Sequence, residues 1–135
     1  MKPHIIRDNK LGDVIASIKN EGFTIAGMLS VHLARPMADE VFEDYRSILR
    51  NYNEIITEMC KAPVVALMLS GSSDIVENFR EFVGPQIPSL AKTVRPDSLR
   101  AKFGVDPIRN AVHCTDLAED GQMESTYFFK TISGL

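Results

Sequence analysis

The chain of 135 residues has no tryptophan, two cysteines and three histidines. Two cysteines do not supply a disulfide framework, so we expect a reducing, cytoplasmic location. No apolar run approaches the roughly 20 residues that span a bilayer, and the opening MKPHIIRDNK lacks the apolar stretch of a signal peptide. Glycine-rich phosphate loops of the GxxxxGK[ST] or GxGxxG type are also missing. A phosphate site, if there is one, must therefore use side chains.

Neither positive nor negative charge dominates the sequence. The 15 basic and 18 acidic residues give a net charge of −3, which disfavours bulk binding to nucleic acid or to an acidic membrane. Hydrophobic residues make up 44% of the chain, enough for a core, and the length fits one domain over residues 1–135.

Hydrophobic periodicity predicts alternating helices and strands. Asn9 is a candidate cap for the first helix and Ser73 for a later one, and Gly22 and Gly84 are placed to end them. The segment between Gly84 and the third histidine is expected to be irregular, and three prolines, Pro85, Pro88 and Pro96, lie in its first half. The predicted elements, in order, are a helix over 9–22, a strand over 23–33, two helices within 37–59, a strand over 63–71, a helix over 73–83, a short helix around 116–122 and a strand over 125–132.

Helices that separate strands favour an α/β (α+β) sandwich. A ferredoxin-like βαββαβ domain with a four-stranded antiparallel sheet fits this order if a strand precedes the first helix. Only residues 1–4 stand before the first turn, so that strand is apparently truncated. Three explanations remain open: the four residues suffice, another chain fills the gap, or the natural chain extends upstream of Met1.

Several cations could converge on a polyanion such as a nucleoside triphosphate, because arginine presents a planar fork to phosphate oxygens. The alternative is an ordinary solvated basic surface. The residues are Lys2, Arg80, Arg95, Arg100, Lys102 and Arg109. The cysteines and histidines show no metal-ligand spacing, and the acidic residues around Asp116–Glu124 are more typical of a helix start, so we expect no metal site made by side chains.

His113 lies in the stretch NAVHCTD, residues 110–116. A neutral imidazole acts as a nucleophile when an acceptor fixes its tautomer, and Glu124 is a candidate acceptor with Thr115 as a bridge. The alternative is a structural histidine, the interpretation that we give to His4 and His32.

NAVHCTD resembles the active-site signature of nucleoside diphosphate kinases, Asn-x-x-His-Gly-Ser-Asp. Lys2-Pro3 resembles the Lys-Pro-Asp of that family's first loop, and 62–66 resembles Gly-Pro-Val-Val-Ala. Arg80 and Gly84 keep an Arg-x-x-x-Gly spacing, and 95–100 resembles Lys-Pro-Gly-Thr-Ile-Arg. The resemblance covers nearly the whole chain.

The resemblance implies ping-pong transfer of a γ-phosphate through phosphorylated His113 to a nucleoside diphosphate, with Mg²⁺ held mainly by the nucleotide phosphates. Glu124 would orient the ring, and Thr115 stands in place of the serine. It also implies a homo-oligomer, a hexamer or a tetramer of dimers. The implied nucleotide-binding residues are Lys2, Tyr45, Tyr52, Arg80, Gln86, Arg100, Pro107 and Asn110.

The sequence departs from that family at its truncated first strand, in a longer segment from Gly84 to Pro96, and at three single residues: Gln86, Pro107 and Cys114. These differences resemble a divergent branch whose domains occur in cilium- or flagellum-associated proteins. The alternative function is therefore a weakly active or inactive kinase-like scaffold module with cytoskeletal partners. Cations beside the phosphate pocket predict a lowered pKa for Cys114, so that oxidation blocks the site; the alternative is a buried space-filling residue.

Overall fold

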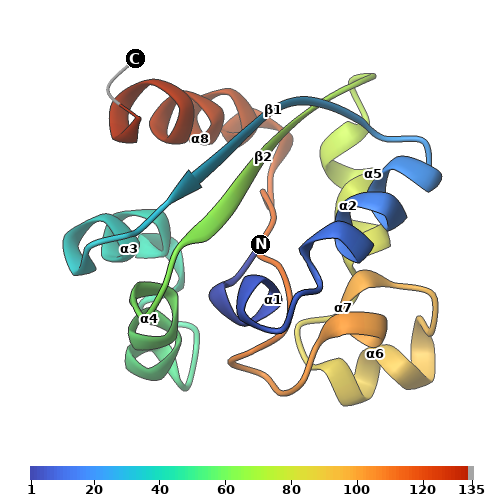
Figure 1. The fold of residues 1–135 in the computed structure, drawn as a ribbon, viewed down its shortest axis with the longest axis horizontal. Helices are drawn as coiled ribbons and strands as arrows, with labels where there is room; N and C mark the ends of the chain where they lie inside the picture. The colour runs from blue at the N-terminus through green and yellow to red at the C-terminus, as the bar shows by residue number, and fades with distance from the viewer. Residues whose placement is uncertain (134–135) are drawn as a thin grey trace.

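A computed structural model describes residues 1–133, with helices packed around one pair of strands (Figure 1). The strands are β1 (Thr24–Val31) and β2 (Val64–Ser70). The α-helices are α1 (Pro3–Arg7), α2 (Leu11–Asn20), α3 (Arg35–Val41), α4 (Tyr52–Cys60), α5 (Ile75–Val83), α6 (Pro88–Val94), α7 (Leu99–Phe103) and α8 (Gly121–Thr126). Two 3₁₀ turns, η1 (Glu43–Tyr45) and η2 (Ala118–Asp120), and a π-helical segment, η3 (Tyr127–Ile132), complete the list.

The two strands pair antiparallel, from Thr24 opposite Ser70 to Val31 opposite Val64. An irregularity between Ile25 and Gly27 shifts the register once. Exposure alternates along β1 as its period-two pattern predicts, with Ile25, Leu29 and Val31 on the less exposed face. The predicted strands over 23–33 and 63–71 are therefore confirmed, as is the α/β class with a small antiparallel sheet.

The first two residues lie beside β2, where the expected fold has its first strand. Met1 exchanges both of its backbone hydrogen bonds with Val65, at 2.6 and 3.2 Å. The Lys2 amide then donates to the carbonyl of Ala111 at 2.9 Å. Helix α1 follows at once, because Pro3 has the backbone angle of a first helical turn and needs no hydrogen bond there. Residues 1–2 thus join β2 to the segment that carries His113.

The predicted strand over 125–132 is wrong. The segment continues α8 into η3. Phe128 and Ile132, four residues apart, both pack on the core around α3 and α4, and this spacing suits a helix face better than a strand. Within residues 1–133 the sheet therefore has two strands rather than the predicted four.

The long segment after Gly84 is also more regular than predicted, because it contains α6 and α7. Pro88 lies in the first turn of α6, and the Ser98 hydroxyl caps α7 by accepting the Ala101 amide at 3.2 Å. The predicted caps were wrong: neither Asn9 nor Ser73 caps a helix by a side-chain bond. Asn9 instead adopts a positive φ of 56° in the turn between α1 and α2.

Two hydrophobic clusters fill the interior. One joins α3, α4 and the start of β2, and the other joins α1, α2, α5, α7 and residues 111–112. Figure 1 shows α3 and α4 on one side of the strand pair and α2, α5, α6 and α7 on the other. Within the described part of the chain, no helix has the length and apolar character needed to cross a membrane.

Candidate active site

The His113 ring lies against two aromatic side chains from the α3–η1 region. Its centroid is 4.6 Å from that of Phe42 and 5.5 Å from that of Tyr45, whose ring meets it edge-on. Burial, the largest cause, and the nearby charges of Lys2, Arg100 and the amino terminus together lower the pKa of His113 to about 3. The imidazole is therefore neutral at neutral pH, as a nucleophile requires.

Thr115 and Glu124 meet as the sequence suggested, because the Thr115 hydroxyl donates to the Glu124 carboxylate. Helix α8 brings Glu124 back to this segment. Burial, with repulsion from Asp120 and Asp116, raises the pKa of Glu124, although the bond from Thr115 opposes that shift. In residues 1–133 no hydrogen bond reaches the His113 ring, so orientation of the ring by Glu124 stays a prediction.

Arg100 is almost fully buried just behind His113. Its guanidinium donates to the carbonyl of Gly84 at 2.8 Å and to that of Val112 at 3.0 Å, while its Nε has no partner among the described atoms. Gly84 has a φ of 86°, and a Cβ there would lie 2.5 Å from the Ser98 hydroxyl, so the position requires glycine. Gly84, which the sequence places four residues after Arg80, thus also provides a backbone acceptor for Arg100.

Arg80 is more exposed, with half of its side-chain surface accessible. It donates to the Asp116 carbonyl at 3.0 Å, and its Nε lies 3.5 Å from the Asp116 carboxylate. Its charge is near enough to Arg100 to lower the pKa of that guanidinium, an effect smaller than that of burial. The two arginines predicted to hold phosphates therefore lie on the same side of the molecule as the His113 segment.

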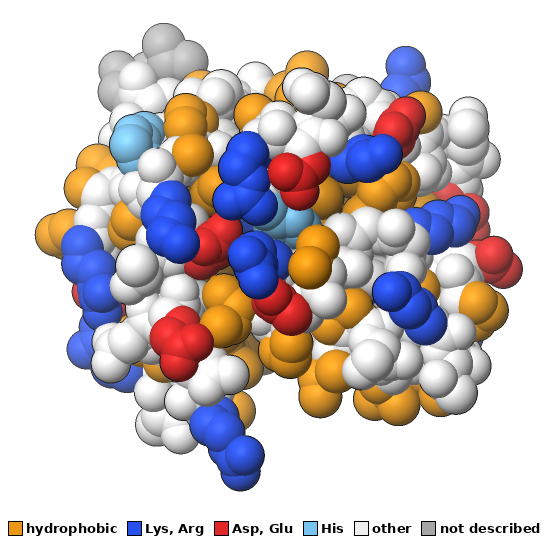
Figure 2. Space-filling view, turned by 60° about the horizontal axis from the view of Figure 1, so that its bottom comes forward, with side chains coloured by type: hydrophobic (Ala, Val, Ile, Leu, Met, Phe, Trp, Pro, Cys, Tyr) orange, Lys and Arg blue, Asp and Glu red, His pale blue; other side chains and the backbone are white. Residues whose placement is uncertain are grey.

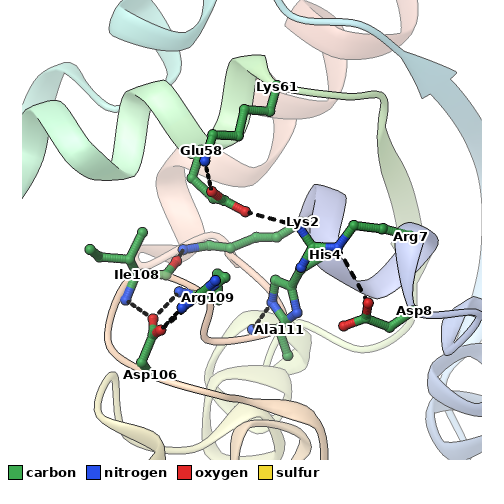
Figure 3. Close-up of polar contacts among 10 residues, drawn as sticks. All are labelled: Lys2, His4, Arg7, Asp8, Glu58, Lys61, Asp106, Ile108, Arg109 and Ala111. Carbon is green, nitrogen blue, oxygen red and sulfur yellow. Dashed lines mark hydrogen bonds and ion pairs between the residues drawn. The ribbon is translucent and has the colours of Figure 1, made fainter.

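Lys2 contributes a third cation. Its side chain is buried, and the ammonium donates to the Ile108 carbonyl at 2.9 Å (Figure 3). Burial, the largest cause, and the charge of Arg100 lower the pKa of Lys2 to about 7, against the opposing effects of Asp106 and Glu58. On the face drawn in Figure 2, basic and acidic side chains alternate around a central hollow in which a histidine is visible.

Asn110 and Gln86 contact each other. The buried Asn110 amide donates to the Gln86 backbone carbonyl at 3.0 Å and to its side-chain oxygen at 3.1 Å. The Asn110 Oδ1 is buried and has no partner among the described atoms. An acceptor left open in this way is suited to a hydroxyl donor from a ligand.

The structure places Tyr52 and Pro107 in other surroundings. The Tyr52 hydroxyl donates to Asp39 at 2.8 Å, and the Arg46 guanidinium lies 5.8 Å from the Tyr52 ring centroid. Tyr52 also lines an open, charged cavity of about 630 Å³ that does not include His113. Pro107 is exposed in the turn where the Asp106 carboxylate accepts two backbone amides. The predicted contacts of these two residues with a nucleotide base stay predictions.

Sequence reasoning missed several features of the site. Phe42 was not among the predicted site residues, although it precedes Tyr45 by three residues and so shares a helical face with it. Asp116 was treated as part of a helix start rather than as the partner of Arg80. Burial raises the pKa of the Cys114 thiol and outweighs the opposing effect of Arg100 and Arg80, so the predicted lowering was wrong.

Comparisons with known proteins agree with this geometry. The family model described as nucleoside diphosphate kinase matches residues 1–133. The chain is 40% identical over 132 residues to the mouse "Nucleoside diphosphate kinase homolog 7", covering 98% of this chain and 33% of that protein. The chain therefore spans about a third of the length of that relative.

Shorter relatives are matched almost entirely. The nucleoside diphosphate kinase of Aquifex aeolicus is 32% identical over 129 residues, which cover 96% of this chain and 89% of that protein. A crystal structure of the same Aquifex kinase superposes with a TM-score of 0.88 over 96% of this chain and 90% of that one. The chain therefore belongs to the nucleoside diphosphate kinase family.

Proposed function

We propose that the protein is a nucleoside diphosphate kinase that works by ping-pong transfer through His113. A ring nitrogen of His113 attacks the γ-phosphorus of a nucleoside triphosphate. The P–N bond forms as the bond to the β,γ-bridging oxygen breaks, and the nucleoside diphosphate leaves. A terminal phosphate oxygen of a second nucleoside diphosphate then attacks the same phosphorus and regenerates the free imidazole.

The observation that carries the proposal is a neutral, partly buried imidazole that lies near the side chains of Lys2 and Arg100. A protonated ring has no lone pair for phosphorus, and the pKa of about 3 keeps the ring neutral at physiological pH. Negative charge on the transferring phosphate is stabilised best by cations that are fixed before the reaction begins. Lys2 and Arg100 are held in this way by backbone carbonyls.

The arginines differ in what they offer the substrate. Two of the five N–H donors of Arg100 are already used by the chain, and its Nε has no partner among the described atoms. We therefore assign to Arg100 electrostatic stabilisation of the phosphate and support of the Val112 backbone. Arg80 holds Asp116 through an accessible ion pair that a phosphate can replace. We therefore assign direct phosphate contact chiefly to Arg80.

Mg²⁺ is part of the proposal, and it would neutralise charge on the phosphates. No group of three or more His, Cys, Asp or Glu side chains that could hold a metal occurs within residues 1–133. This fits an ion carried mostly by the nucleotide, because Mg²⁺ is commonly bound by substrate phosphates with one or two carboxylates. Asp116 is a carboxylate on the same side as Arg80, and Asp120 lies near enough to raise its pKa.

The proposed partners are nucleoside di- and triphosphates and further copies of the chain. The sites assigned to the nucleotide are His113 with Glu124 and Thr115, then Lys2, Tyr45, Arg80, Gln86, Arg100 and Asn110, with Tyr52 and Pro107 assigned to the base. Because the mouse relative is about three times as long, these assignments concern the matched region.

The test is to incubate the purified protein with ATP labelled at the γ-phosphate and to look for protein-bound phosphate that is labile in acid and stable in alkali. His113→Ala should lose the label. His32→Ala is the matched control, because His32 is exposed directly after the end of β1 and bonds to the Cys60 carbonyl at 2.8 Å. The control should keep the label.

If the wild-type chain binds nucleotide and takes up no label, the kinase proposal fails. The alternative, a kinase-like binding or scaffold module, then takes its place.

A further inference from the structure

The peptide before His113 has an unusual conformation. Ala111 has a φ of 76°, and the Val112 amide donates to the Asn110 carbonyl at 3.0 Å, which closes a three-residue γ-turn around Ala111. Positive φ is unfavourable for alanine, and a turn of this hand is rare and strained. Strain of this kind, on the order of 1–3 kcal/mol, persists only where surrounding groups fix the backbone.

Two groups from the start of the chain fix it here. The Ala111 amide donates to the Nε2 of His4 at 2.9 Å, and the Ala111 carbonyl accepts from the Lys2 amide at 2.9 Å (Figure 3). His4 and Ala111 are both fully buried. The backbone N–H and the backbone C=O of Ala111 are therefore both held by residues that lie more than 100 positions earlier in the sequence.

We propose that His4 is a positioning residue for His113, because its neutral Nε2 holds the Ala111 amide and so fixes the turn that presents the His113 ring. The proposal rests on the kinase function proposed above. It does not make His4 a group that touches the substrate. It assigns a role to a residue whose sequence position suggested only a structural one.

The role depends on the protonation state of His4. Nε2 accepts only when the proton of the neutral ring is on Nδ1, and a protonated ring has two donors and no acceptor. The Ala111 amide would then face another donor in a buried site, and an unsatisfied buried amide is costly. Acidification should therefore release the turn, and with it the placement of His113.

The surroundings of His4 favour the neutral ring. Burial is the largest cause that lowers its pKa, and the charges of Lys2 and Arg7 add to it. Asp8 and Glu58 act in the opposite direction. The Asp106–Arg109 ion pair also lies in this region (Figure 3). The transition therefore falls below the ordinary histidine pKa of about 6.5.

Three variants separate positioning from general stability. His4→Leu removes the acceptor and keeps an apolar side chain of similar size. His4→Gln restores an acceptor that does not titrate, with its side-chain amide at a similar reach. Ile18 lies on α2, in the hydrophobic cluster that also contains Ala111. Ile18→Val is therefore the control for a modest loss of core packing.

The measurement is the single-turnover rate of His113 phosphorylation at saturating ATP, together with the nucleotide dissociation constant. We expect His4→Leu to slow phosphorylation by about 10- to 100-fold, because a misplacement of about 1 Å has effects of that size. Nucleotide affinity should change little. His4→Gln should recover most of the rate, and Ile18→Val should keep it.

The pH profile gives the second readout. The wild-type rate should fall as the pH falls below about 6.5, whereas the His4→Gln profile should stay flatter. A His4→Leu rate and profile equal to those of the wild type would overturn the inference.

If the wild type takes up no label at all, the kinase proposal fails, and the inference is then decided by NMR. Hydrogen exchange at the Ala111 amide and the ring C–H signals of His113 should both differ between wild type and His4→Leu. Identical exchange and identical ring signals would overturn the role of His4 independently of activity.

Discussion

The two ends of the proposed nucleotide site differ in how the chain holds them. At the transfer end, Lys2, Arg100 and Asn110 are at most 5% exposed, and each bonds to atoms from a distant part of the sequence. At the proposed base end, Tyr52 is held by Asp39 and Arg46, which come from the neighbouring α3–η1 region. The Arg46 side chain there is 60% exposed.

The difference indicates which part of the chemistry the fold fixes in advance. Buried cations are unfavourable unless they are bonded, and here backbone carbonyls of the His113 segment and its neighbours provide those bonds. Exposed ion pairs contribute little and rearrange readily. The structure therefore orders the proposed transfer end strongly and leaves the proposed base end adaptable.

The largest effect is expected from replacing the buried Arg100, which we compare with the more exposed Arg80. Arg100→Met removes two charged hydrogen bonds, to Gly84 and Val112, and should lower the free energy of unfolding by about 2–4 kcal/mol. Arg80→Met breaks an accessible pair with Asp116 and should lower it by about 1 kcal/mol or less. Urea unfolding at pH 7 measures both. Equal effects would mean that burial does not separate the two arginines.

The next prediction, with an effect of intermediate size, is that Lys2 makes the stability of the fold depend on pH. Its folded pKa of about 7 lies below the unfolded value of 10.5, so the unfolded chain binds more protons between these values. Stability should therefore rise with pH, by up to about 1.4 kcal/mol per pH unit. The range from pH 8 to 10 avoids most of the similar contribution of the amino terminus, whose pKa is lowered from 8.0 to about 5.

The variant for this test is Lys2→Met, which should flatten the rise in urea midpoint between pH 8 and 10. Lys10→Met is the matched control, because Lys10 is exposed, and it should keep the wild-type slope. A wild-type midpoint that falls over this range would contradict the buried, deprotonating ammonium.

The smallest effect is expected at the base end. Tyr52→Phe removes the hydroxyl that donates to Asp39, while Arg35 and Arg46 remain beside that carboxylate. The rate of His113 phosphorylation should stay within about 3-fold of the wild type, as for a substitution that leaves the core unchanged. A single-turnover assay with ATP measures it. A loss of rate as large as that expected for His4→Leu would show that Tyr52 belongs to the ordered end of the site.

Local patterns predicted the parts of the fold that depend on local physics. The two strands, the helix after the first turn and the end of α5 at Gly84 follow from periodicity and from glycine at a positive φ. The pattern failed over 125–132, where alternation suggested a strand and the packing of Phe128 and Ile132 on α3 and α4 selected a helix. A short apolar segment is compatible with both structures, and only its neighbours decide between them.

The site shows the same division. The resemblance of NAVHCTD to a family signature singled out His113 and Thr115, with Glu124 as the candidate orienting group, and the structure brings the last two into contact. The spacing carried no information on the role of His4, because its hydrogen bond to Ala111 joins residues 107 positions apart.

The sequence by itself determined the class of fold, both strands and the identity of the candidate nucleophile, because these follow from periodicity and from residue types at short spacing. Tertiary structure decided that His113 is neutral, that Lys2 and Arg100 are buried behind it, and that the Ala111 turn is held by His4. These properties depend on desolvation and on contacts between distant segments, and no local pattern records either of them.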